Sequence, residues 1–92
     1  GAKLVFAVTT PPCIGPEKKV NFMVSDEQAE EFNRSAQAVM KKHGVVINDL
    51  YSAIGQDRAK YQLGENDVHY NDAGRYLLAT QVSRVIISEL SK

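Results

Sequence analysis

Two short apolar runs with one helical segment between them constrain the fold of this chain more than any other feature. The first run, KLVFAVTT at residues 3–10, is rich in β-branched and aromatic residues and is closed by Pro11 and Pro12. The second run is VVIN at residues 45–48. Short runs without apolar–polar alternation predict strands that are buried on both faces, as in parallel sheets covered by helices.

The segment between the two runs has the signals of an amphipathic helix. Ser25, with Gln28 three residues later, matches a capping box, and His43-Gly44 is a natural stop. A strand, a helix and a strand in this order predict a βαβ unit with parallel pairing and a right-handed crossover. The apolar positions of the helix are Ala29, Phe32, Ala36, Val39 and Met40.

The rest of the chain is expected to be largely helical. A short helix is expected over residues 49–54, and the polar residues 56–64 favour another helical turn or two. Asn71 is predicted to cap a long last helix. The fold class is therefore α/β, in a single domain over residues 1–92. The apolar stripe of the last helix is Ala73, Leu77, Leu78, Val82, Val85, Ile86 and Leu90.

Two parallel strands do not make a self-sufficient sheet. Each strand has an unpaired edge, and three or more strands are the usual minimum for independent stability. We therefore expect a partner that supplies the rest of the sheet, or a second copy of the chain that covers the edges in a homodimer.

Composition excludes several classes of partner and site. Eleven basic and eleven acidic residues cancel, so there is no electrostatic case for nucleic acid or an anionic membrane. The single cysteine, Cys13, cannot form an internal disulfide, and no compartment is predicted. His43 and His69 lack the spacing and the thiolate neighbours of a zinc site. No metal and no cofactor is expected.

His69 is the strongest candidate for a catalytic residue. It lies in a polar stretch just before the last helix, with Asp67 two residues and Asn66 three residues before it. In a hydrolytic triad a carboxylate holds one imidazole nitrogen while the other nitrogen faces the nucleophile. The alternative is a solvated loop in which Asp67 and His69 only favour the turn.

Three stretches resemble successive parts of one enzyme family. DVHYNDAGRYLLATQVSRVI, residues 67–86, resembles the last conserved block of the SGNH (GDSL-type) hydrolases. LVFAVTTPP resembles the penultimate strand and its loop, and FNRSAQAVMKKHGVVINDLYSAI resembles the helix, last strand and short helix that follow. The resemblance covers nearly all of the chain. It implies the C-terminal half of a flavodoxin-like, three-layer α/β/α fold with about two of the parallel strands.

The resemblance also implies roles for the residues around His69. His69 matches the base that takes the proton of the catalytic serine, and Asp67 is the nearest match to the orienting acid. The family usually places this acid where the chain has Asn66. Either Asp67 acts from a shifted backbone, or the triad is reduced to a dyad.

Three further residues are candidates to line the same crevice. Tyr70 follows His69, while Thr10 and Asn48 close the two expected strands. Their alternative roles are packing at the helix start, turn formation and capping.

The nucleophile of such a hydrolase is missing from this chain. The sequence has neither a Gly-Asp-Ser motif nor a Gly-x-Asn-Asp motif, and GVVIND at residues 44–49 fails on spacing. Ser52, Ser83, Ser88 and Ser91 fall in expected helices, and Ser25 is explained as a cap.

We therefore expect a part of a serine esterase that supplies the histidine and the acid, is inactive alone and needs the missing N-terminal half. Two alternatives stay open. One is a non-enzymatic α/β module or truncated gene product that dimerises through its sheet edges. The other is a small-ligand binding domain that uses the strand ends without chemistry.

Overall fold

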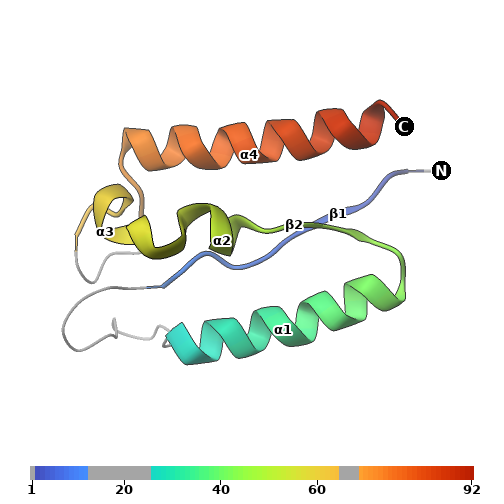
Figure 1. The fold of residues 1–92 in the computed structure, drawn as a ribbon, viewed down its shortest axis with the longest axis horizontal. Coiled ribbons are helices and arrows are strands. Elements are labelled where there is room, and N and C mark those ends of the chain that lie inside the picture. Colours follow the sequence, from blue (N-terminus) through green and yellow to red (C-terminus); the bar gives the residue numbers. More distant parts are fainter. Residues whose placement is uncertain (1, 13–25, 65–68) are drawn as a thin grey trace.

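The computed structural model describes residues 2–12, 26–64 and 69–92, and these form a mixed α/β fold that is mostly helical. α1 lies on one side of the two strands and α4 on the other (Figure 1). None of the described helices combines the length and the hydropathy that crossing a membrane requires. The elements are β1 (Val5–Ala7), α1 (Asp26–Lys42), β2 (Val46–Asn48), α2 (Leu50–Ile54), the 3-10 turn η1 (Gly55–Asp57), α3 (Arg58–Tyr61) and α4 (Asp72–Leu90).

β1 and β2 pair in parallel, as the order of strand, helix and strand predicts. Val5 lies opposite Val46, and Ala7 lies opposite Asn48. The backbone N–H of Val8 extends the ladder by donating to the carbonyl of Asn48 at 3.1 Å. Both strands are shorter than the apolar runs that contain them.

The prediction that β1 is buried on both faces is wrong. Leu4 is 66% exposed and Val5 is 36% exposed. β2 is better covered and ends at Asn48, which is 2% exposed. The physical reason is that α1 and α4 pack mainly against β2. β1 is therefore only partly covered by the two helices.

α1 ends as local signals predict, but only part of its apolar stripe is covered. The chain leaves the helix through Gly44, whose φ of 70° suits a residue without a side chain, and the N–H of Val45 returns to the carbonyl of Met40 at 2.9 Å. Phe32 and Val39 were expected to face the core, yet they are 60% and 53% exposed because the sheet beneath has two strands among the described residues. Ser25, the expected cap, lies outside the described residues.

The predicted cap of α4 is confirmed, and its stripe is partly covered. The side-chain oxygen of Asn71 accepts from the N–H of Gly74 at 2.8 Å. Ile86 and Leu90 are 45% and 70% exposed although both belong to the expected stripe, and Ala73 is exposed too. The other four members, Leu77, Leu78, Val82 and Val85, are half-buried.

The expected helical turns between β2 and α4 are also present. The carboxylate of Asp49 caps α2 by accepting from the N–H of Ser52 at 3.0 Å. η1 and α3 continue the helical path to Tyr61. Asp49 is the first residue after β2 and also the cap of α2. α2 therefore follows β2 with one connecting residue.

Asn33 joins α1 to the end of β1. Its side chain is 5% exposed, accepts from the N–H of Thr9 at 2.9 Å and donates to the carbonyl of Thr9 at 2.9 Å. Both backbone groups of one residue are therefore satisfied by a single amide. This contact fixes the separation between the helix layer and the sheet.

Asn33→Ala should lower the free energy of unfolding by roughly 1–3 kcal/mol, because it removes both hydrogen bonds and leaves the backbone groups of Thr9 without their partner. Urea unfolding followed by circular dichroism measures the change. Ser35→Ala on the exposed surface of the same helix is the matched control and should change the free energy of unfolding little. Equal stability of Asn33→Ala and Ser35→Ala would contradict this role of Asn33.

Candidate functional site

His69 lies on an exposed stretch whose backbone is held by the end of α3. The carbonyl of His69 accepts from the N–H of Leu63 at 3.1 Å. The next residue, Tyr70, forms an antiparallel bridge with Gln62, and the N–H of Asn71 donates to the carbonyl of Tyr61 at 2.8 Å. His69 is exposed, and these bonds hold the main chain that carries it.

Tyr70 attaches this stretch to the chain that follows β1. Tyr70 is 9% exposed, and its hydroxyl donates to the carbonyl of Pro11 at 3.3 Å. Gln62 donates to the same carbonyl through Nε2 at 3.2 Å. Pro11 follows the carboxyl end of β1, and in open α/β sheets ligands bind beyond the carboxyl ends of the strands. The bonds of Tyr70 and Gln62 therefore tie the backbone next to His69 to the segment that follows β1.

Gly74 lets α4 approach this anchor closely. A β-carbon at position 74 would lie 3.0 Å from the β-carbons of Tyr61 and Tyr70 and 3.1 Å from the carbonyl oxygen of Tyr61. The first turn of α4 therefore packs directly against Tyr70 and the last turn of α3. This close contact is possible because Gly74 has a hydrogen atom in place of a side chain.

The structure describes two of the four other residues expected at the site, and these two have different surroundings. Asp67 and Asn66 lie outside the described residues. Thr10 is half-buried and precedes Pro11, so it lies at the same end of the sheet as Tyr70. Asn48 is enclosed, and its side-chain oxygen accepts from Nε2 of Gln81 on α4 at 3.2 Å. Asn48 thus joins the sheet to α4.

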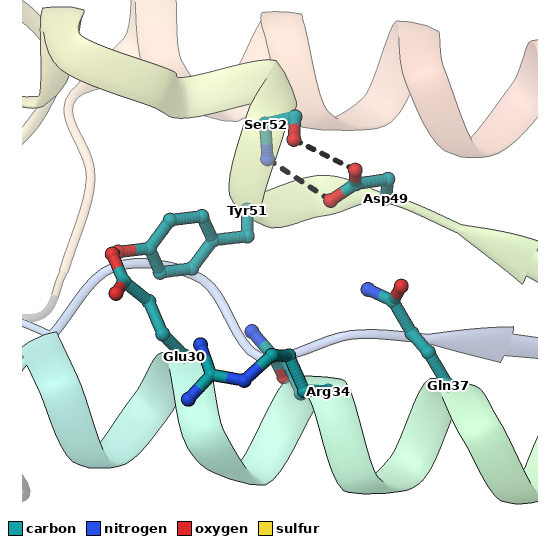
Figure 2. A pocket seen from close by; sticks show the side chains of 7 residues that line it. Glu30, Arg34, Gln37, Asp49, Tyr51 and Ser52 are labelled. Carbon is teal, nitrogen blue, oxygen red and sulfur yellow. Dashed lines mark hydrogen bonds between the residues drawn. The ribbon is translucent and has the colours of Figure 1, made fainter.

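A hollow of about 270 Å³ lies between α1 and the start of α2. Sequence reasoning missed it; the position of Asp49 directly after a strand was the one local signal that pointed to it. Figure 2 shows the residues that line it from both sides, namely Glu30, Asn33, Arg34 and Gln37 from α1 and Asp49, Tyr51 and Ser52 from the start of α2.

Polar side chains around this hollow pair with one another. The hydroxyl of Ser52 donates to Oδ2 of Asp49 at 2.7 Å, so the serine faces a carboxylate that already caps its own helix (Figure 2). No histidine lines the hollow. Among the described residues that line the hollow, Ser52 has the carboxylate of Asp49 as its hydrogen-bond partner.

An ionic network next to the hollow connects α1 to α2 and α3. The hydroxyl of Tyr51 donates to Oε1 of Glu30 at 2.8 Å, and Nη1 of Arg58 pairs with Oδ2 of Asp26 at 2.5 Å. Burial and the hydrogen bond to Glu30 raise the pKa of Tyr51, against a smaller opposing effect of Arg58. Burial lowers the pKa of Arg58, but the hydrogen bond and the charge of Asp26 outweigh it and the pKa is raised. Both groups keep their protons at neutral pH.

No cluster of three or more metal-ligating side chains occurs among the residues that the structure describes. No known family model matches the sequence, and no curated protein matches it significantly.

Gly74→Ala should lower the free energy of unfolding by about 1 kcal/mol or more, because the new methyl group meets backbone and β-carbon atoms that cannot move away easily. Helix propensity alone predicts the opposite sign, a gain of about 1 kcal/mol. Thermal or urea unfolding decides the sign. Ser83→Ala, on the exposed surface of α4, is the control and should be neutral or slightly stabilising; a stabilised Gly74→Ala would show that α4 and Tyr70 are not in close contact.

Proposed function

We propose that this chain supplies the histidine half of a serine esterase of the SGNH type. In this proposal the two strands and their helices are part of a three-layer α/β/α fold, and a separate polypeptide segment supplies the nucleophile. The observation that carries the proposal is that His69 is exposed and that its neighbour Tyr70 bonds, together with Gln62, to Pro11 in the segment that follows β1. The resemblance of residues 67–86 to the last block of the family supports it.

The chemistry assigned to His69 is general base and then general acid catalysis. The imidazole takes the proton of the incoming serine hydroxyl as its oxygen attacks the carbonyl carbon of the ester. The same proton passes to the leaving alcohol when the carbon–oxygen bond breaks, which leaves an acyl-enzyme. A water molecule then attacks the acyl group with His69 again as base, which releases the acid and restores the serine.

Two features of the site depend on other residues. Asp67 is proposed to orient the imidazole, and in the alternative form Asn66 takes the usual position of the acid and the catalytic pair is a dyad. The missing segment must also supply oxyanion donors, because loss of one such donor typically costs about a hundredfold or more in rate. The substrate class is a small ester, such as a carbohydrate acetyl ester.

The second candidate function is a non-enzymatic α/β module that dimerises through its sheet edge. The observation that favours it is the exposure of Leu4 and Val5 on β1.

The chain alone should not hydrolyse p-nitrophenyl acetate above the rate of a histidine-containing control protein. Hydrolysis should appear when the chain is mixed with the N-terminal portion of an SGNH hydrolase that carries the Gly-Asp-Ser and Gly-x-Asn-Asp motifs. His69→Ala should then lower the rate of the mixture by about 10²–10⁴-fold, the range of one general base. His43→Ala, which removes the exposed histidine after α1, is the matched control and should leave the rate unchanged.

Two outcomes would contradict the proposal. Hydrolysis by the chain alone that His69→Ala abolishes would mean that a nucleophile is present within it. Equal rates for the His69→Ala mixture and the unmodified mixture would remove His69 from the role of base.

A further inference from the structure

The hollow between α1 and the start of α2 has two polar walls, and the wall from α2 is already bonded within the protein. Both oxygens of Asp49 accept from Ser52, one from its N–H and one from its hydroxyl. The hydroxyl of Tyr51 donates to Oε1 of Glu30 on the opposite wall at 2.8 Å. These bonds hold the side chains of the α2 wall in one arrangement.

The wall from α1 contains polar groups that are not used in this way. Arg34 and Gln37 line the hollow, and neither forms a hydrogen bond or an ion pair with a residue that the structure describes. Figure 2 shows Gln37 extending from α1 toward the side where Asp49 and Ser52 lie. A guanidinium group has five N–H donors, and an amide has two donors and an acceptor oxygen. The α1 wall therefore has donors without an acceptor in the described part of the chain.

Glu30 has the right spacing to pair with Arg34 but is bonded elsewhere. A glutamate four residues before an arginine on a helix is well placed for an ion pair. The described residues contain no such pair, because Oε1 of Glu30 accepts from Tyr51 instead. The bond to Tyr51 thus leaves the guanidinium group of Arg34 available, and Oε2 of Glu30 can accept a further hydrogen bond.

The charges around the hollow favour a neutral ligand. Two carboxylates, Glu30 and Asp49, line it together with one guanidinium group, that of Arg34. An anion bound at Arg34 would be repelled by both carboxylates, and a cation bound at the carboxylates would be repelled by Arg34. A hydroxyl group is uncharged and can donate and accept at once. It can therefore accept from Arg34 or Gln37 while it donates to Glu30.

The size and the remaining wall of the hollow limit this ligand to one small ring. The volume of 270 Å³ is below the range of about 300–1,000 Å³ that is typical of pockets for drug-sized molecules. The ring of Tyr51 also lines the hollow, and its face is an apolar surface (Figure 2). A sugar ring has hydroxyl groups around its edge and C–H groups on its faces, so it matches both kinds of wall.

We propose that the hollow between α1 and α2 binds a neutral monosaccharide. A face of the sugar lies against the ring of Tyr51. Neighbouring hydroxyl oxygens accept from the planar guanidinium group of Arg34 and from the amide of Gln37, and one hydroxyl donates to Oε2 of Glu30. Arg34 and Glu30 are exposed, so water competes for these bonds and the dissociation constant is in the millimolar range.

This inference does not rest on the esterase proposal. Neither His69 nor Tyr70 lines the hollow, and binding a sugar needs no nucleophile. Loss of sugar binding would leave the role of His69 untouched, and an inactive His69 would leave sugar binding untouched. The two proposals therefore fail separately.

Two-dimensional amide NMR spectra of the isotope-labelled chain test the site directly. Glucose, galactose and xylose are each titrated into the chain. At least one of them should shift the side-chain N–H signals of Arg34 and Gln37 and the backbone amides of residues 49–52, and the shifts should saturate. Glycine, which is a zwitterion, and sodium phosphate, which supplies an anion, should not shift these signals at the same concentrations.

Three variants then locate the bound sugar. Arg34→Ala should raise the dissociation constant by about tenfold or more, the effect of losing hydrogen bonds to a charged group. Gln37→Ala should raise it in the same direction by a smaller factor. Arg84→Ala, which removes an exposed arginine from α4, is the matched control and should leave the dissociation constant unchanged. Circular dichroism shows that each variant is folded, as expected when the replaced side chains of α1 have no bonds to described residues.

Four outcomes would overturn the proposal. The first is the absence of a saturable shift with all three sugars. The second is sugar binding that Arg34→Ala leaves unchanged, because the sugar would then lie elsewhere. The third is an equal shift of the same signals by glycine or phosphate, which would make the ligand charged. The fourth is equal weakening by Arg84→Ala and Arg34→Ala, which would reflect the charge of the whole chain and not the hollow.

Discussion

The hydrogen bonds between β1 and β2 hold the candidate site and the helix layers in one arrangement. Asn33 of α1 binds Thr9, and Tyr70 and Gln62 bind Pro11, so both contacts end on the residues that directly follow β1. The position of β1 therefore decides where α1 lies and where the backbone of His69 is held. Yet β1 has one hydrogen-bonded neighbour among the described strands, and three of its residues pair.

This dependence connects stability to the proposed chemistry. A chain of this length buries only about 60–65% of the surface of its unfolded state, so its margin of stability is small. An additional strand on the outer edge of β1 would stabilise the segment to which the loop of His69 is attached. A second copy and a nucleophile-bearing half would both use this edge, which means that self-association and assembly of an esterase would compete.

The elements themselves could be predicted from the sequence because their signals are local. Asn71, Asp49 and Gly44 each act on groups within a few residues, and the structure has a cap or a helix end at each of them. Parallel pairing followed from the order of the elements. These features depend on chain geometry and need no knowledge of distant residues.

The exposure of β1 and the anchoring of Tyr70 could not be predicted in this way. The sequence of an apolar strand does not show whether helices cover that strand or only the strand beside it. The exposure of Leu4 therefore depends on where α1 and α4 pack. The bonds from Tyr70 to Pro11 and from Tyr51 to Glu30 join residues far apart in the chain and have no local pattern. Sequence reasoning identified His69 as a candidate, and the contacts that hold its backbone are known only from the structure.

Amide hydrogen exchange in β1 tests the central claim most directly, because adjacent residues point to opposite edges of the strand. The N–H of Val8 faces β2 and should exchange slowly at every protein concentration. The N–H of Ala7 faces the edge of β1 with which no other described strand pairs. A strand added there, by a nucleophile-bearing half or by a second copy, should slow its exchange, and the protection should be lost on dilution. An Ala7 amide that exchanges at the unprotected rate at all concentrations, while Val8 stays protected, would show that no strand covers this edge and would contradict the account.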